Sequence, residues 1–254
     1  MKVNDRVVVV TGGASGIGKG LAERFQREGA RHVVVADRNE AGAQQVAEAI
    51  GGTGVGLDVS EANAGYVTVG GLEAPVEDLQ RMWEVHVLAH LYAARAVLPG
   101  MIERGHGYLL NTASAAGLLT QLGSLSYSVT KHAAVALAEW IAITHGHQGI
   151  RVSVLCPQAV ETAITANSPD RDKFVGDGFG VASQDGVIQP EDVNQCVIEA
   201  LDEERFWVLP HPEVAEYARR KTADVDRWIG GMMRFQERMF GEDAQPGDWL
   251  VRDR

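Results

Sequence analysis

The chain alternates between short β-branched runs and longer segments that carry apolar residues at helical spacing. Residues 7–10 are four consecutive valines, a pattern typical of a parallel strand that is buried on both faces. The next segment carries Ile17, Leu21 and Phe25, which would share one face of a helix. This alternation predicts an α/β fold built on a doubly wound parallel sheet of Rossmann type.

The alternation continues along most of the chain. We expect strands at residues 31–36, 55–58, 107–112, 152–156 and 206–209, and helices at 19–28, 41–50, 75–104, 125–147 and 190–201. Residues 165–189 are rich in Gly, Asp and Ser and lack periodicity, so they form either a substrate lid or a disordered surface loop. Residues 212–240 predict one long amphipathic helix, which packs on its own domain or covers a neighbouring subunit.

Composition narrows the class of protein. With 254 residues, 45% of them apolar, the chain can bury one sizeable core, so we expect a single domain over residues 1–254. The net charge of −11 argues against binding to nucleic acid or to anionic membranes. No apolar run approaches the ~20 residues of a membrane span, no signal peptide is expected, and two cysteines suit the reducing cytoplasm.

A glycine-rich turn lies where the first strand meets the first helix, and residues 11–18 read TGGASGIG. Gly12 permits a tight turn, Gly16 lets the backbone approach a pyrophosphate, and Gly18 lets the helix pack closely on the strand. The helix amino terminus would face the phosphate charge. The turn therefore predicts a dinucleotide site.

Asp37, at the end of the second predicted strand, bears on the choice of dinucleotide. A carboxylate there can accept hydrogen bonds from both ribose hydroxyls and would repel a 2′-phosphate, which favours NAD over NADP. Arg38 and Lys19 argue the other way, since either cation could reach a phosphate.

Tyr127 and Lys131 stand four residues apart in a predicted helix, so they share one face, and Ser114 lies upstream. A free tyrosine has a pKa of about 10 and is a poor base at neutral pH. A nearby ammonium would favour the phenolate and lower that pKa, and the serine could bind an oxygen that gains charge. This group of residues predicts acid/base chemistry beside the dinucleotide.

Taken together, these motifs resemble the short-chain dehydrogenase/reductase family from about residue 5 to residue 210. The resemblance implies that Tyr127 is the acid/base, that Lys131 lowers its pKa and binds the nicotinamide ribose, and that Ser114 steadies the substrate oxygen. It also implies that the Val160 backbone and the Thr162 hydroxyl hold the nicotinamide carboxamide. The cofactor-binding residues that it implies are Gly12, Ser15, Gly16, Ile17, Gly18, Asp37, Arg38, Asp58, Val59, Asn63, Ala64, Gly65, Tyr127, Lys131, Pro157, Val160 and Thr162.

Two single residues depart from that family's pattern. His86 stands where the family usually places an asparagine that completes a proton relay. Imidazole can also pass protons, so His86 is a catalytic candidate, and its alternative role is simple helix packing. Gln158 stands where glycine is common, a milder change because the role there is mostly that of the main chain.

The third departure is a missing segment. Only Ser60, Glu61 and Ala62 separate Asp58-Val59 from Asn63, where the family has a helix and the central fourth strand. A parallel crossover needs about a dozen residues, so we expect both elements to be absent. Three outcomes are then open: the first and fifth strands of the family's order close up, residues 66–69 fill the position, or the chain is a deletion variant or an incomplete sequence.

The sequence therefore predicts an NAD-dependent oxidoreductase that interconverts a secondary alcohol and a ketone on a small molecule. The resemblance to the family also implies a homodimer or homotetramer. The alternatives are a dinucleotide-binding or scaffold protein disabled by the deletion, and an NADP-linked carbonyl reductase. His86 and His90 have a spacing that suits zinc, but no third ligand is evident, so no metal is expected.

Overall fold

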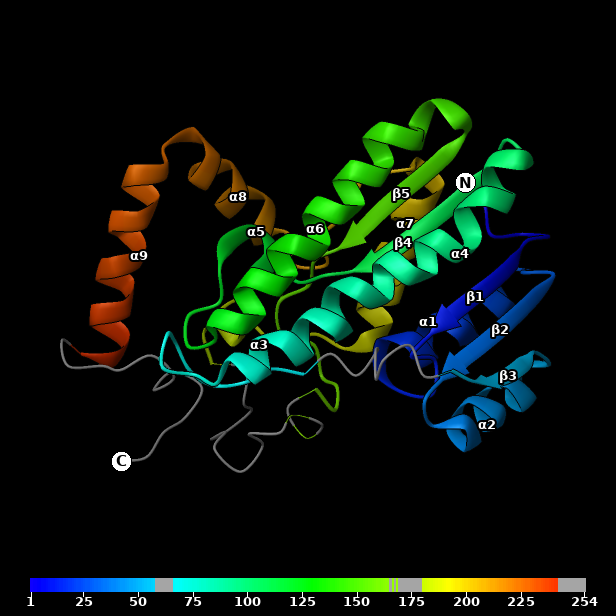
Figure 1. Ribbon diagram of the computed structural model, residues 1–254, viewed down its shortest axis with the longest axis horizontal. Helices are drawn as coiled ribbons and strands as arrows, with labels where there is room; N and C mark the ends of the chain where they lie inside the picture. The colour runs from blue at the N-terminus through cyan, green and yellow to red at the C-terminus, as the bar shows by residue number, and fades with distance from the viewer. Residues whose placement is uncertain (58–65, 165, 167, 169–179, 242–254) are drawn as a thin grey trace.

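The computed structural model describes residues 1–57, 66–164, 166, 168 and 180–241 (Figure 1). Its strands are β1 (Val7–Thr11), β2 (His32–Asp37), β3 (Thr53–Gly56), β4 (Gly107–Thr112), β5 (Ile150–Leu155) and β6 (Trp207–Val208). Its main helices are α1 (Gly16–Arg27), α2 (Glu40–Ile50), α3 (Val76–Trp83), α4 (Ala89–Glu103), α5 (Ala116–Leu119), α6 (Leu125–His145), α7 (Pro190–Glu203), α8 (Glu213–Ala223) and α9 (Val225–Phe240). The predicted α/β alternation is confirmed, and α5 is an element that the pattern did not indicate.

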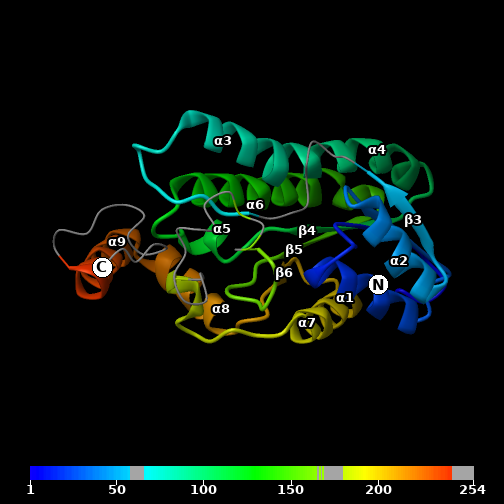
Figure 2. The same cartoon turned by 90° about the horizontal axis from the view of Figure 1, so that it is seen from below.

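The strands form two three-stranded parallel sheets, ordered β1-β2-β3 and β4-β5-β6. Val10 pairs with Val35 in the first sheet, and Leu110 pairs with Ser153 in the second. Figure 2 shows α4 and α6 on one side of the strands and α1 and α7 on the other. Helices on both faces are the arrangement expected of a doubly wound parallel sheet.

One apolar cluster joins the two sheets on the α1 side. Phe25 of α1, Val35 of β2, Val197 of α7 and Leu155 of β5 are all buried in it. Fully burying side chains of this size stabilises a fold by ~1.5–3 kcal/mol each. The packing of α1 on α7 therefore holds the two halves together.

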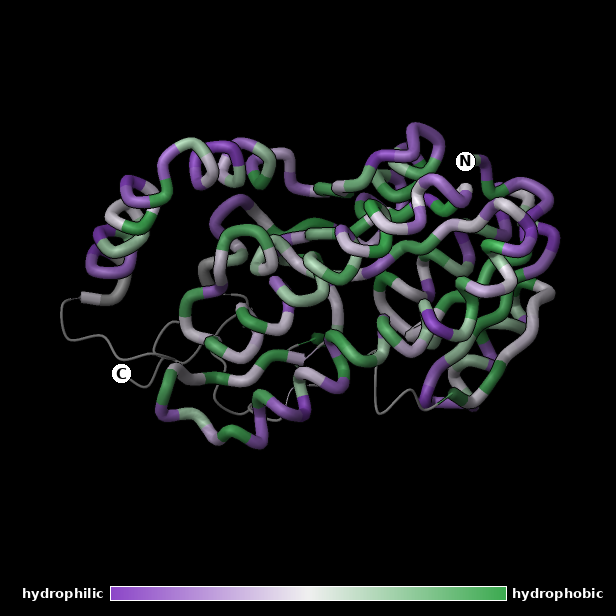
Figure 3. Tube along the Cα trace, turned by 45° about the horizontal axis from the view of Figure 1, so that its top comes forward, coloured by the Kyte–Doolittle hydropathy of each residue, from purple (hydrophilic) through white to green (hydrophobic). Residues whose placement is uncertain are grey.

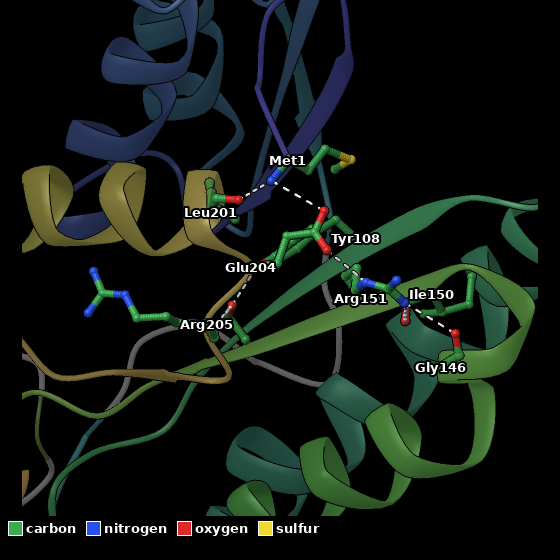
Figure 4. Close-up of polar contacts among 9 residues, drawn as sticks. Met1, Tyr108, Gly146, Ile150, Arg151, Leu201, Glu204 and Arg205 are labelled. Atoms are coloured by element: carbon green, nitrogen blue, oxygen red, sulfur yellow. Dashed lines mark hydrogen bonds and ion pairs between the residues drawn. The ribbon is translucent and has the colours of Figure 1, made fainter.

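A smaller polar link lies at the amino ends of the strands (Figure 4). The Met1 ammonium donates to the Leu201 carbonyl and lies 3.5 Å from Glu204, whose other oxygen accepts from Arg151 of β5 at 2.8 Å. These groups are partly exposed, so each pair contributes only ~0–1 kcal/mol.

The two sheets do not pair with each other among the described residues. Strand β1 lies at the edge of one sheet, and strand β4 lies at the edge of the other. Among the described residues no strand lies between them, and the connection at residues 58–65, where we expected a helix and strand to be missing, lies outside the described residues. Strands β1 and β4 have not closed up. Residues 66–69 do not fill the position either, since Tyr66 and Val67 pack with Met82 and Tyr127 instead.

This interruption corrects one expectation about β1. Val10 is buried, but Val7 and Val9 are 52% and 58% exposed, although four consecutive valines indicated a strand buried on both faces. The reason is tertiary: a strand buried on both faces needs neighbours at both edges, and among the described strands β2 is the one that pairs with β1.

Residues 76–103 form one continuous helix in which the π-helical turn η1 (Glu84–Leu88) joins α3 to α4. In the described part of the chain this is one helix whose length and apolar composition would suffice to cross a membrane. Here α3 and η1 pack against α6 and α4 packs against β4, with Val85 and Ala89 among the buried residues. Figure 2 shows α3 and α4 on the same side of the strands as α6.

The prediction of a single long C-terminal helix is wrong. Asp224 adopts an extended conformation and its side chain accepts from the Arg227 N–H at 2.9 Å, so α8 ends and α9 begins there. Figure 3 shows alternating hydrophobic and hydrophilic positions along α9, which stands away from the body of the molecule. The amphipathic pattern is therefore present, but on two helices.

Candidate active site

The glycine-rich turn has the geometry that its sequence predicted. Gly12 and Gly16 have φ angles of +65° and +52°, a region that favours glycine. A Cβ on Gly18 would overlap the carbonyl group of Gly12, lying 2.8 Å from its carbon. Ser15 is the N-cap of α1, and the free N–H groups of that first turn are suited to bind an anion.

Asp37 is held by the backbone at the carboxyl end of β2. Its two oxygens accept from the Ala14 N–H at 3.1 Å and from the Asn39 N–H at 2.9 Å. Arg38 is exposed beside it, and Lys19 lies 3.9 Å from Glu23. The carboxylate is therefore fixed next to the glycine turn, where a ribose could reach it.

The remaining predicted adenine-side residues, Asp58 and Val59, lie outside the described residues, as do Asn63, Ala64 and Gly65.

Tyr127, Lys131 and Ser114 come together as the spacing predicted. The Ser124 hydroxyl caps α6 by accepting from the Tyr127 N–H at 3.4 Å, which starts the helix that carries both Tyr127 and Lys131. The Lys131 Nζ lies 5.4 Å from the centre of the Tyr127 ring. Ser114 follows β4, lies close enough to Tyr127 to lower its pKa, and accepts from the Ala116 N–H at 3.1 Å.

The electrostatics of this group differ from the sequence-based expectation. Burial raises the pKa of Tyr127, and the hydrogen bond from Ser114 opposes this only in part. Burial also lowers the pKa of Lys131 from 10.5 to about 8, and its Nζ donates to the Thr112 carbonyl at 3.5 Å. The pKa of this fully buried phenol therefore moves in the opposite direction to the one expected from a neighbouring ammonium, because desolvation is the largest effect on it.

His86 lies in the middle of the π-helical turn and is 2% exposed. Its Nδ1 is 2.9 Å from the Thr130 hydroxyl, and its ring meets Tyr127 edge-on at 5.5 Å between centres. Its Nε2 has no hydrogen-bond partner among the described residues. Burial, then Lys131, lowers the pKa of His86 well below its usual value, so the ring is neutral.

His90 is the second buried imidazole of this helix. Burial and Lys131 lower its pKa to about 4, and a hydrogen bond to the Thr112 backbone opposes the change. Across the residues with a described placement, no group of three potential metal ligands occurs. The sequence indicated His90 only as a possible partner of His86 in a zinc pair. The structure instead places it near enough to Lys131 for that charge to lower the His90 pKa.

The segment after β5 closes the site on the other side. Pro157 accepts from the Ser114 hydroxyl at 3.3 Å, and Val160 forms a bridge with Ile188. The Thr162 side chain lies 3.4 Å from where a Cβ of Gly16 would be, so this segment meets the glycine turn. The contacts with a dinucleotide that the resemblance implies for Pro157, Val160 and Thr162 stay a prediction.

Sequence reasoning missed a polar network behind this segment. Gln158 donates to Asp185 at 2.8 Å from its side chain, and to His211 at 3.2 Å from its backbone. Asp185 also accepts from the Tyr217 hydroxyl of α8 at 3.1 Å. No spacing rule links residues so far apart, although the replacement of glycine by Gln158 was a signal that something different is bonded there. Of the predicted lid, residues 165, 167 and 169–179 lie outside the described residues.

One cavity of about 1160 Å³ connects these groups. It runs from the glycine turn to the catalytic candidates, and it is lined by Gly12, Ser15, Gly16, Ile17, Gly18, His86, Ser114, Tyr127, Lys131, Pro157, Val160 and Thr162. The anion-binding turn and the buried phenol thus share one space. The glycine cradle fits a dinucleotide, since a Cβ at Gly18 would collide with the Gly12 carbonyl and force the turn out of this conformation.

Comparison with known proteins agrees with this geometry. The family model described as short chain dehydrogenase matches residues 6–63 and 52–173. The chain is 32% identical to a 1-deoxy-11-beta-hydroxypentalenate dehydrogenase of Streptomyces exfoliatus, over 90% of this chain and 91% of that protein.

Two solved structures share the fold. One is a short chain dehydrogenase/reductase from Burkholderia phymatum in complex with NAD, with a TM-score of 0.76, 25% identity, and coverage of 89% of this chain and 96% of that one. The other is an L-sorbose reductase from Gluconobacter frateurii complexed with NADPH and L-sorbose, with a TM-score of 0.68, 25% identity, and coverage of 82% and 97%. On the family model and the extent of this identity, the chain belongs to the short-chain dehydrogenase family of oxidoreductases, whose solved neighbours bind a nicotinamide dinucleotide.

Proposed function

We propose that this protein is an NAD-dependent oxidoreductase that interconverts a secondary alcohol and a ketone on a small molecule. The observation that carries the proposal is the cavity that contains both the glycine turn and the Tyr127–Lys131–Ser114 group. An acid/base residue is useful for this reaction only where the reacting carbon can lie between it and the dinucleotide.

The backbone of the α1 turn, at Gly12 and Ser15 to Gly18, would hold the pyrophosphate. Asp37 would accept from the adenosine ribose, which favours NAD, and Val160 and Thr162 would hold the nicotinamide end. The bound dinucleotide supplies hydride transfer, and the protein supplies position and a proton.

Tyr127 would exchange the proton of the substrate hydroxyl, and Ser114 would hydrogen-bond the same oxygen as its charge changes. Lys131 would hold the nicotinamide ribose and steady the phenolate. His86 is neutral, and its Nδ1 is hydrogen-bonded to Thr130, so its Nε2 is available to pass a proton onward from Tyr127.

The test of this assignment is Tyr127→Phe, which removes one buried hydroxyl and keeps the ring. Turnover of NAD with a panel of secondary alcohols, followed by the absorbance of reduced nicotinamide, should fall by at least ~100-fold. NAD affinity, measured by titration calorimetry, should change little. A rate equal to that of the wild-type protein would refute the role of Tyr127.

The choice of cofactor has its own test. Asp37→Ala removes the carboxylate and leaves Arg38 exposed, so affinity for NAD should fall and affinity for NADP should rise. If the ratio of the two affinities does not change, Asp37 does not select the cofactor. A wild-type protein that binds NADP more tightly than NAD would make an NADP-linked carbonyl reductase the better assignment.

A second candidate function is dinucleotide binding without turnover, and the interruption between β1 and β4 favours it. The same titrations separate the two, because this candidate binds NAD saturably but reduces none of it with any alcohol in the panel.

A further inference from the structure

One peptide group beside the candidate active site is held at both of its ends. It joins Pro157 to Gln158 in the segment after β5. Its carbonyl, from Pro157, accepts from the Ala115 N–H at 2.8 Å and from the Ser114 hydroxyl at 3.3 Å. Its N–H, from Gln158, donates to the Nδ1 of His211 at 3.2 Å. A trans peptide group is planar and its C=O and N–H point in opposite directions, so it cannot turn at one end without turning at the other.

The second sheet brings His211 to this peptide group. Leu155 of β5 pairs with Val208 of β6 in parallel register, and Gln158 and His211 each follow that pair at the same distance along the chain. A proline directly precedes His211 and another directly follows it, which restricts the backbone at this position. The His211 side chain is buried. Strand pairing, prolines and burial therefore fix the ring where it meets the Gln158 N–H.

The hydrogen bond determines the form of the His211 ring. Its Nδ1 can accept from a main-chain N–H only when it carries no proton, so the ring is neutral and its proton is on Nε2. Burial lowers the pKa of His211, which favours this neutral form. The Gly186 backbone and the carboxylates of Glu213 and Asp185 oppose the change, and the net direction is still downward. The ring thus stays an acceptor for the peptide group at neutral pH.

The other end of the peptide group bears on the Ser114 hydroxyl. That hydroxyl has one proton, which it donates to the Pro157 carbonyl, and its oxygen accepts from the Ala116 N–H. The carbonyl also accepts from the Ala115 N–H at a shorter distance, so its bond from Ser114 is the weaker of the two. A substrate oxygen could replace it. The orientation of the peptide group therefore sets where the serine proton points before a substrate binds.

We propose that His211 is a positioning residue, which holds the Pro157–Gln158 peptide group and through it directs the Ser114 hydroxyl toward the substrate oxygen. The inference rests on the proposed function, because the direction of that hydroxyl matters only when the oxygen beside it gains or loses charge. His211 does not belong to the described residues that line the cavity, so it acts through the peptide group. The alternative is that the ring only fills space between β6 and α8.

Two substitutions of His211 separate these roles. His211→Asn places an amide oxygen near the position of Nδ1, so it can still accept from the Gln158 N–H. His211→Leu fills a similar volume and has no acceptor. At saturating NAD and alcohol, kcat should stay within ~3-fold of the wild-type value in His211→Asn and fall at least ~10-fold in His211→Leu. The affinity for NAD, to which the glycine turn and Asp37 would contribute most, should change by less than ~3-fold in both variants.

Tyr217→Phe is the matched control in the same polar network. It removes the hydrogen bond from Tyr217 to Asp185 and leaves both ends of the peptide group in place, so kcat should stay within ~3-fold of the wild-type value. Hydrogen exchange followed by mass spectrometry gives a second measurement that needs no turnover. Residues 157–162 should exchange faster in His211→Leu than in the wild-type protein, and at the wild-type rate in His211→Asn.

The proposal is overturned if His211→Leu keeps the wild-type kcat, or if the Leu and Asn variants lose kcat equally. Should His211→Leu fail to fold, His211→Gln takes its place with the same expected loss, because its amide lies one bond farther out, near Nε2 rather than Nδ1. A wild-type protein without turnover would refute the proposed function instead. Hydrogen exchange then decides the role of His211 in holding the peptide group: equal rates in His211→Leu and the wild type would overturn that role.

Discussion

We predict that the buried ammonium of Lys131 lowers the stability of the folded protein, although the proposed chemistry uses this group. Its side chain is buried, and burial lowers its pKa from 10.5 to about 8. A change of that size corresponds to about 3 kcal/mol of unfavourable free energy for carrying the charged form inside the protein. Among the described residues its Nζ has one hydrogen bond, 3.5 Å long, to the Thr112 carbonyl, which at the usual net value for such a bond offsets about 1 kcal/mol or less.

Replacing Lys131 by Met keeps most of the volume and removes the charge. At pH 7 the variant should therefore unfold with a free energy about 2 kcal/mol higher than the wild-type protein, while losing turnover. The assay is urea denaturation followed by circular dichroism, with NAD and alcohol turnover measured on the same samples.

The difference in unfolding free energy between Lys131→Met and the wild type should change with pH in one direction. Below pH 8, Lys131 is protonated in both the folded and the unfolded state, and the whole cost is present. Between about 8 and 10.5 the folded state releases the proton while the unfolded state keeps it, so wild-type stability rises relative to Lys131→Met. The difference between the two proteins should shrink through that interval and disappear above it.

The control is Lys19→Met, a change at a half-exposed lysine of α1 that should alter stability by no more than ~0.5 kcal/mol. Should Lys131→Met prove less stable than the wild type at pH 7, or should the difference not vary from pH 7 to 10, the cost assigned to burying the ammonium is wrong.

Three further changes test other parts of the structure. Gly18→Ala should destabilise the protein by ~1–3 kcal/mol in urea and weaken NAD binding, because its Cβ would meet the backbone of Gly12. The control Gly100→Ala should leave both quantities unchanged, because its Cβ meets only the flexible end of Arg104. Asp224→Ala should cost ~1 kcal/mol and reduce helical circular dichroism, because the hydrogen bond to the Arg227 N–H is lost, while Asp226→Ala, one residue inside the helix, should cost less. His86→Leu should lower turnover by ~10-fold or more. His86→Asn keeps a hydrogen-bonding side chain and should retain most of the wild-type turnover. Equal rates in the two variants would mean that His86 only packs.

Much of the fold follows from local pattern. The valine run, the helical spacing after it and the turn at Gly12 to Gly18 predicted β1, α1 and their junction to within a few residues. The strand at residues 107–112 was predicted with its observed bounds. These features depend on periodicity and on the backbone freedom of glycine, which short segments carry by themselves.

The catalytic group could also be predicted in part. The four-residue spacing placed Tyr127 and Lys131 on one helix face, but the pKa of Tyr127 could not be predicted in the same way. Its direction depends on how completely α6 is covered by Tyr66, His86 and their neighbours, and a sequence does not state burial. The network of Gln158, Asp185 and Tyr217 escaped prediction for a related reason, since its members are joined only by packing.

By itself, then, the sequence determined the kinds of elements, the phosphate-binding turn and the family, because each is written in nearby residues. Only the tertiary structure decided that β1 and β4 are edge strands of two separate sheets in the described part of the chain, that Val7 and Val9 are exposed, and that Asp224 divides the C-terminal helix. Pairing and burial are properties of surfaces that meet across the molecule. Their energies are set by the partner that is present or missing rather than by the residues of one segment.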